Sequence, residues 1–383
     1  MLCPLGTDCG AIDFKPQWGG FKLLLDPRFG QAKRAEFEAR LRSVAPPGNG
    51  IWIASSGTTR KEGDGYTFLA IGEGALIASA EGVNTHLRAG KDDVFVSCLP
   101  DFHVGGLGLQ VRAHLLGAQF VRSPGNNEPW NAAEFVGAVG RGGGTIVSLV
   151  PTQVNDLVRA GLKAPPSVRV AVVGGGAISR GEYRRGRALG WPLLPSYGST
   201  ECSSQVATAS LESLRGESGD ELPGLQILPH IEAKEVDGVL HLRSVALFMG
   251  TARLSDSAVT VQIRESGAWF KTSDRVALAG NTLTPLGRID DYIKIGGEGV
   301  NLHELSLLVR EIHAEIDLPG DAALRPVADE RLGMVLSLEV TAEPLGKEIQ
   351  SRFNARVLPF AKIRSVQTVS RIEKTALGKV KRT

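Results

Sequence analysis

The sequence has few cysteines, little net charge and no long hydrophobic run, and each of these absences excludes a class of protein. Its four cysteines form no CxxC pair and no metal-ligand spacing, so reduced thiols in the cytoplasm are the simplest interpretation. The 43 basic and 41 acidic residues leave a net charge of +2, which is too small to indicate a nucleic-acid partner. No apolar run approaches the ~18 residues of a membrane helix, and no signal peptide is expected.

The first half of the sequence alternates apolar strands with helices. Ile51–Ser55 and Val94–Leu99 read as strands, and Phe68–Leu87 reads as a helix between them. Continuous apolar strands between helices predict an α/β domain whose sheet is covered on both faces. Because ligands of such sheets lie beyond the carboxyl ends of the strands, we expect one site on the loops after Ile53, Leu99, Val173 and Tyr197.

The second half has a different pattern. Short strands with Gly or Asp-Gly turns begin at Ile227–Glu235 and continue to about residue 286, which predicts a β-rich subdomain. After Arg288 the order becomes helix, strand, strand, helix, strand. We therefore predict a large domain over residues 1–289 and a small α+β domain over residues 290–383.

Two segments offer groups for phosphate. A cluster of hydroxyls and one glycine follows the first strand, at Ser55, Ser56, Gly57, Thr58 and Thr59. It can present O–H and N–H groups to a phosphate, although it lacks the P-loop pattern and an ordinary turn is the alternative. Near the other end, Lys379 follows Gly378 and can swing onto developing phosphate charge; a solvated basic tail is the alternative.

Two more segments follow the ends of strands. The glycines Gly174, Gly175 and Gly176 allow close approach of a flat ligand, or form a tight turn. In Ser196-Tyr197-Gly198-Ser199-Thr200-Glu201, the ring of Tyr197 can stack on a base. Thr200 and Glu201 supply the oxygen ligands that Mg²⁺ prefers. We expect the adjacent Cys202 to be a buried small residue and not a nucleophile.

Three further residues become candidates for the site when they are considered together with the segments above. The carboxylate of Asp274 can accept both hydroxyls of a ribose, and Arg288 can bind ribose or phosphate oxygens. His103 opens a helix in His-Val-Gly-Gly and is a candidate for the wall of a pocket. Taken singly, each of these residues is more typical of a turn or a helix cap.

Taken in their order along the chain, these six segments resemble the adenylate-forming superfamily of acyl-CoA synthetases, adenylation domains and luciferases. The resemblance runs from about Trp52 to the end of the sequence. It implies a large domain with an α/β sheet and a β-rich subdomain, and a small domain on a hinge. It also implies ATP, Mg²⁺ and coenzyme A as cofactors, and a small-molecule carboxylate that becomes an acyl-adenylate and then a thioester.

The resemblance also implies roles for individual residues. Ser55 to Thr59 would hold the ATP phosphates, Thr200 and Glu201 the phosphate and Mg²⁺, and Asp274 with Arg288 the ribose. Gly174 to Gly176 with Ser196, Tyr197 and Gly198 would frame the adenine. Lys379 would bridge the acyl carboxylate and the α-phosphate. Asp290 would be the hinge that brings Gly296 and Gly297 to the site for thioester formation.

Three stretches look most like 2-succinylbenzoate–CoA ligases of menaquinone synthesis: residues 148–153, 200–208 and 296–300. By this resemblance, His103, Thr152, Ser204 and Gln205 would line the acyl pocket. Polar groups at Ser204 and Gln205 suit a keto group or a second carboxylate, whereas an alkyl tail needs an apolar wall.

The sequence departs from the family pattern in three places. Arg60 stands where a glycine is usual, and Lys61-Glu62-Gly63 replaces Pro-Lys-Gly. Ser273 replaces the glycine before Asp274. The N-terminal subdomain reads as shortened, and dimerisation is one way to cover the sheet that this would expose. Three alternatives stay open: another aryl or short-chain acid, a carrier-protein thiol as acceptor, and a non-catalytic binding protein.

Overall fold

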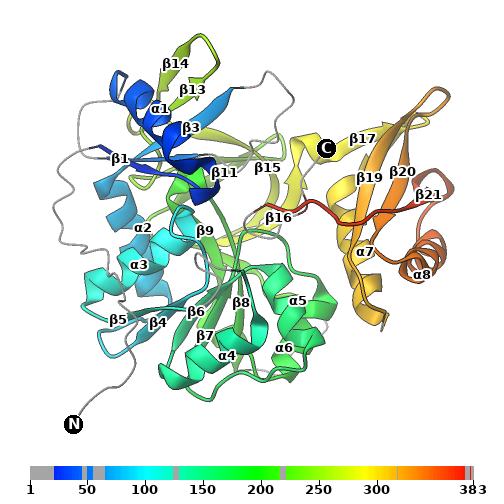
Figure 1. Ribbon diagram of the computed structural model, residues 1–383, viewed down its shortest axis with the longest axis horizontal. Coiled ribbons are helices and arrows are strands. Elements are labelled where there is room, and N and C mark those ends of the chain that lie inside the picture. The colour runs from blue at the N-terminus through cyan, green and yellow to red at the C-terminus, as the bar shows by residue number, and fades with distance from the viewer. Residues whose placement is uncertain are drawn as a thin grey trace.

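The computed structural model describes residues 21–44, 50–54, 65–123, 129–215, 221–316, 318–375 and 380. Figure 1 shows a large body joined to a smaller one, with the smaller body formed by the C-terminal elements. Within the described ranges, no helix combines the length and the apolar character that a membrane crossing requires.

Five parallel strands form the centre of the large body. In spatial order they are β8 (Leu193–Ser199), β7 (Val170–Val173), β6 (Ile146–Leu149), β4 (Val94–Ser97) and β5 (Gln119–Arg122). Successive side chains alternate between two faces. Val170 and Val172 therefore join one buried cluster, and Ala171 and Val173 join another.

Helices cover both faces of these strands, as the sequence predicts (Figure 1). One cluster includes residues of α2 (Glu73–His86) and α3 (Val104–Leu116). The other includes residues of α4 (Ala132–Arg141), α5 (Pro151–Arg159) and α6 (Arg180–Ala188). The strands are thus buried on both sides, which is why they read as continuous apolar runs.

Antiparallel strands extend this sheet beyond β8 to 11 strands. The added strands, in chain order, are β9 (Ser204–Ala209), β10 (Leu225–Ile227), β11 (Glu232–Val236), β12 (Val239–Arg243), β15 (Phe270–Ala279) and β16 (Thr282–Arg288). The predicted strand Ile227–Glu235 is wrong as a single element. It is divided because the chain turns at Leu228–Ile231, where the Ile231 N–H donates to the Leu228 carbonyl.

A second sheet has five strands, with α1 (Gly30–Arg42) packed on one face. Its order is β1 (Phe21–Leu24), β2 (Gly50–Ala54), β3 (Tyr66–Gly72), β13 (Gly250–Leu254) and β14 (Val259–Ile263).

The predicted helix Phe68–Leu87 is wrong in its first part, because β3 ends at Gly72 and α2 begins at Glu73. Phe68 faces the cluster under α1, whereas Leu69 faces the cluster under α2 and α3. A short run buried on both faces has no hydrophobic periodicity to distinguish a strand from a helix.

The smaller body follows the turn Ile289–Asp291. It contains the hairpin β17 (Tyr292–Ile295) and β18 (Glu298–Asn301), and then α7 (Leu302–Glu315), β19 (Ala322–Asp329), β20 (Gly333–Val340), α8 (Glu343–Asn354) and β21 (Ile363–Thr368). The hairpin was not predicted, and the remaining order agrees with the sequence analysis. Among the described residues, no buried hydrophobic cluster joins side chains from both sides of Asp290.

Candidate functional site

The carboxyl ends of β6, β7 and β8 meet at one edge of the central sheet. The Gly174 N–H donates to the Leu149 carbonyl at 3.0 Å, and Ser196 Oγ donates to the Val173 carbonyl at 3.1 Å. A Cβ on Gly174 would lie 2.8 Å from Ser196 Oγ, so a side chain at this position would force the two segments apart. Three separate loops therefore share one surface, at the place where α/β sheets bind ligands.

Tyr197, Asp274 and Arg288 come together at this edge from three strands. The Tyr197 hydroxyl donates to Asp274 Oδ2 at 2.6 Å, and Arg288 Nη1 lies 3.8 Å from Asp274 Oδ1. Asp274 and Arg288 are opposite each other in the β15–β16 ladder, so the sheet register places the two charges together. Burial and the neighbouring Asp274 carboxylate raise the pKa of Tyr197, which keeps its hydroxyl a donor.

The Ser199–Ser203 turn between β8 and β9 carries Thr200 and Glu201, both partly exposed. This turn is tight, because a Cβ on Gly198 would lie 2.1 Å from the Ser204 carbonyl oxygen. Cys202 is fully buried, and burial raises the pKa of its thiol to about 12. The prediction that Cys202 is a buried small residue is confirmed.

The carboxylate of Glu201 can serve as one ligand of a divalent ion. Within the part of the chain that the structure describes, no group of three or more His, Cys, Asp or Glu residues could hold a metal. Mg²⁺ usually takes one or two protein carboxylates and completes its shell with phosphate and water oxygens. One protein carboxylate, completed by phosphate and water oxygens, fits that pattern.

The four predicted pocket residues lie around α3, α5 and β9. His103 is the residue before α3, Thr152 lies in the first turn of α5, and Ser204 begins β9. A Cβ on Gly108 of α3 would lie 3.3 Å from Ser204 Oγ, so α3 and β9 are in close contact there. Gln205 is buried, and its amide oxygen accepts a hydrogen bond from Thr208 Oγ1 at 2.6 Å.

Sequence reasoning missed Arg112, one helical turn after Gly108 on α3. Its side chain is buried, and burial lowers its pKa to about 10. Nε donates to the Gly108 carbonyl at 3.2 Å, Nη2 lies 3.5 Å from Ser148 Oγ, and Nη1 has no partner. Among the described residues, no carboxylate lies within ion-pair distance of this guanidinium. The signal was a lone arginine in the otherwise mostly apolar stretch Leu107–Leu116.

Some predicted residues lie outside the described residues: Ser55 to Thr59, Arg60 and Lys379. Others belong to the small body or to the turn before it. Lys374 Nζ donates to Asp321 Oδ2 at 2.8 Å, and the chain after β21 runs back toward the large body (Figure 1).

Gly296 and Gly297 form the β17–β18 turn, where the Gly296 N–H donates to the Leu332 carbonyl. Figure 1 shows β17 leading away from the large body. Asp290 is exposed in the connecting turn.

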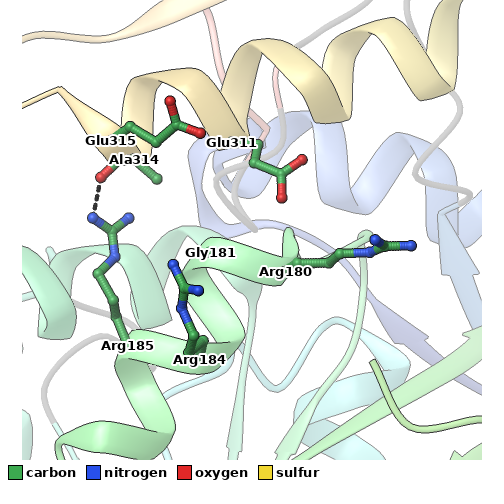
Figure 2. Close-up of a pocket in the computed structure, with 7 residues that line it drawn as sticks. All are labelled: Arg180, Gly181, Arg184, Arg185, Glu311, Ala314 and Glu315. Atoms are coloured by element: carbon green, nitrogen blue, oxygen red, sulfur yellow. Dashed lines mark hydrogen bonds between the residues drawn. The ribbon is translucent and has the colours of Figure 1, made fainter. Parts of the chain in front are cut away.

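A cleft of about 380 Å³ lies between α6 and α7, where the two bodies meet. Figure 2 shows arginines from α6 facing carboxylates from α7 across it. Its lining residues are Arg180, Gly181, Arg184, Arg185, Glu311, Ala314 and Glu315. None of these was predicted from the sequence.

The chain is similar to known AMP-binding proteins. A family described as AMP-binding enzyme matches residues 70–243. The 2-succinylbenzoate–CoA ligase of Escherichia coli (strain K12) is 29% identical over 260 residues, which are 68% of this chain and 52% of that protein. The chain therefore spans about half the length of this relative.

Two solved structures share the fold. Both are o-succinylbenzoate CoA synthetase (MenE) from Bacillus subtilis, one in complex with the acyl-adenylate intermediate OSB-AMP and one with ATP and magnesium ion. The first has a TM-score of 0.69 and the second 0.67, and each is 22% identical in sequence. Each match covers 86% of this chain, with 67% and 68% of the respective synthetase chains.

Proposed function

We propose that this chain joins a carboxylic acid to coenzyme A at the expense of ATP. It matches the AMP-binding enzyme family over residues 70–243 and has the adenylate-forming fold, and both support the proposal. The observation that carries the proposal is the meeting of Tyr197, Asp274 and Arg288 beside the Gly174 loop. These residues come from separate strands, and the β15–β16 register places Asp274 opposite Arg288.

In the proposed nucleotide site, Asp274 accepts hydrogen bonds from the ribose hydroxyls. Its Oδ2 is oriented by Tyr197, and Arg288 lies beside its Oδ1. Gly174 to Gly176 and the ring of Tyr197 frame the adenine, because residues without side chains permit close approach of a flat base. Charge-assisted bonds of this kind are stronger than neutral ones and fix the nucleotide's position.

The phosphate end lies toward Thr200 and Glu201 in this proposal. Bound Mg²⁺ would neutralise phosphate charge there, with Glu201 as its protein ligand and Thr200 on a phosphate oxygen. Ser55 to Thr59 are proposed to hold the phosphates, and Lys379 to reach the α-phosphate.

The chemistry runs in two steps. A carboxylate oxygen of the acid attacks the α-phosphorus of ATP, the bond to the β-phosphate oxygen breaks, and pyrophosphate leaves. The coenzyme A thiolate then attacks the acyl carbon, and AMP leaves with the bonding electrons. Positioning and charge stabilisation lower both barriers. Between the steps the small domain turns about Asp290, which brings the Gly296–Gly297 turn to the site.

We assign 2-succinylbenzoate as the acid, and Arg112 supports this choice. A buried guanidinium without a carboxylate partner is costly, and a second carboxylate on the substrate would neutralise it. Ser204 lies against Gly108, one turn from Arg112, so the cation is next to the proposed pocket. An aryl or short-chain acid with a single carboxylate would leave this charge unpaired.

Mass spectrometry of products tests the proposal. The protein is incubated with ATP, Mg²⁺, coenzyme A and a panel of acids that includes 2-succinylbenzoate and its monocarboxylic analogues. We expect AMP, pyrophosphate and the succinylbenzoyl thioester. A thioester with another acid alone would contradict the substrate, and no adenylate or thioester with any acid would favour a non-catalytic binding protein. Transfer only to a carrier-protein thiol would replace coenzyme A as the acceptor.

The role of Lys379 has its own test. Lys379→Ala should sharply lower adenylate formation, whereas thioester formation from supplied acyl-adenylate should be less affected. Equal loss in both steps would refute the assignment.

A cytoplasmic homodimer completes the proposal. The edge strand β14 carries Ile263, which is 71% exposed, and an exposed apolar edge favours pairing with another chain. Light scattering of the purified protein checks this, and a monomer at micromolar concentration would contradict it.

A further inference from the structure

Arg310 of α7 connects the small body to the loop that follows β7. Its Nη2 donates to both carboxylate oxygens of Glu182 at 2.7 Å, and its Nη1 donates to the Ala177 carbonyl at 2.5 Å. Ala177 follows Gly176 directly. One side chain of the small body therefore contacts both the end of the glycine loop and the helix after it.

The large body also holds Glu182 by itself, because the Glu182 carboxylate accepts a hydrogen bond from the Ser179 N–H at 2.8 Å. With Arg310 in contact, the Glu182 side chain is 4% exposed. Ser179 Oγ in turn accepts from the Glu182 N–H, so the two residues form the capping box of α6. The carboxylate that fixes the start of α6 is thus the same one that Arg310 neutralises.

Other contacts between the two bodies support this arrangement. Arg185 of α6 donates to the Ala314 carbonyl of α7, as Figure 2 shows. Arg159 of α5 donates to the Leu318 carbonyl at 2.5 Å. Because these bonds end on backbone carbonyls, they do not neutralise charge. Among the described ion pairs, Arg310–Glu182 alone joins a residue before Asp290 to one after it.

We propose that Arg310 is a positioning residue, which holds the Gly174–Ala177 loop in its nucleotide-binding conformation only while the small domain is docked as observed. This inference rests on the proposed function, in which the small domain changes orientation between the two steps. When α7 leaves α6, the Ala177 carbonyl loses its donor and Glu182 loses its cation. The first step therefore requires the docked orientation, and nucleotide contacts loosen when the small domain turns.

Separate assays of the two steps test this role. Arg310→Gln should raise the KM for ATP and lower acid-dependent pyrophosphate release by about tenfold, the size of effect expected when a charged hydrogen-bonded pair is broken. Thioester formation from supplied acyl-adenylate should not fall, because that step does not use this orientation. Equal loss in both steps would overturn the proposal.

Glu182→Gln gives an independent measure, because glutamine can keep the capping box while removing the charge. It should reproduce the Arg310→Gln effect, and the double variant should be no worse than either single one. Additive effects would mean that the two residues do not act through each other. Arg325→Gln is the matched control, because Arg325 pairs with Glu339 across the β19–β20 ladder inside the small body and should leave both steps unchanged.

A structural readout separates failure of this inference from failure of the proposed function. Energy transfer between dyes on exposed positions of the two bodies should show a smaller docked population in Arg310→Gln than in the unaltered protein. If the protein activates no acid but this shift occurs, the function is wrong and the docking contact stands. An unchanged docked population would overturn the inference whatever the activity.

Discussion

Arg112 and Arg310 are both held away from bulk water, but they meet different surroundings. Arg310 is partly buried at the junction of the two bodies, where Glu182 neutralises it with two short hydrogen bonds. Arg112 is buried inside the large body, where only a carbonyl and a distant hydroxyl approach it. The protein supplies a partner for one cation and none for the other among the described residues.

Under the proposed function, this difference separates a charge with a structural role from a charge that a ligand would neutralise. A buried charge with an ion-pair partner is neutralised within the fold. A buried charge without one lowers stability unless a ligand neutralises it. The Nη1 atom of Arg112 has no hydrogen-bond partner among the described residues, and a buried unsatisfied donor of this kind indicates that a polar group outside the described chain completes it.

The largest effect is expected for Arg112→Met. Loss of the cation should lower thioester formation with 2-succinylbenzoate by about 100-fold, since a buried charged hydrogen bond is worth ~2–3 kcal/mol. The free energy of unfolding should stay the same or rise by about 1 kcal/mol, because a buried charge without a partner is removed. Steady-state kinetics and urea unfolding measure the two quantities. A clear loss of stability would show that Arg112 is structural, and the comparison would fail.

Arg310→Met should have the opposite stability effect. It leaves the Glu182 carboxylate buried without its cation, at a cost of about 1–3 kcal/mol. Thermal unfolding should therefore begin at a lower temperature than in Arg112→Met. Unfolding curves for the two variants in one buffer provide the check, and the reverse order would break the comparison between the two arginines.

Tyr197→Phe should have a moderate effect on the nucleotide site. It removes the donor to Asp274 Oδ2 and keeps the ring, so the KM for ATP should rise about three- to tenfold while the fold is retained. Initial rates at varied ATP measure this. An unchanged KM would mean that Tyr197 does not orient Asp274 toward the nucleotide.

The smallest effect concerns His313 of α7, near the junction of the two bodies. Burial and the positive charge of Arg159 lower its pKa to about 4. Between pH 6.5 and about 4 the unfolded chain binds a proton that the folded protein does not, so stability is complete above pH 6.5 and falls as the pH drops.

Removing the imidazole isolates this contribution. His313→Gln should flatten the fall of the melting temperature over that range, by comparison with the unaltered protein. His230 of the large body has its pKa lowered to about 4 by burial, so His230→Gln should flatten the fall by a similar amount and provides the comparison for a histidine away from the junction. An identical pH profile for the unaltered protein and His313→Gln would contradict the prediction.

The central sheet could be predicted because its strands carry their own signal. Val170–Val173 is apolar throughout and is followed by three glycines, which indicates a strand buried on both faces and a turn beyond it. Tyr66–Gly72 carries a similar signal and was misread, since periodicity does not separate a short buried strand from the start of a helix. The β17–β18 hairpin was missed because four-residue strands offer too few alternations to recognise.

In the candidate site, too, some residues can be recognised in the sequence, and others only in the folded structure. The sequence singles out Tyr197, Asp274 and Arg288 because each belongs to a recognisable segment, and the structure brings these three side chains together. Arg112 belongs to no such segment, and its importance depends on having no carboxylate beside it after folding. Arg310 is similar, since its partner Glu182 is 128 residues away in the sequence.

By itself, the sequence determined the alternation of strands and helices, the residues that gather at the strand ends, and the resemblance to the adenylate-forming enzymes. These properties are local, because hydrophobic period, turn residues and motif order can be read along the chain. Only the tertiary structure decided which charges are paired. An arginine can stabilise the fold only if a carboxylate that is distant in the sequence lies beside it in the folded protein. The packing of helices and sheets decides this.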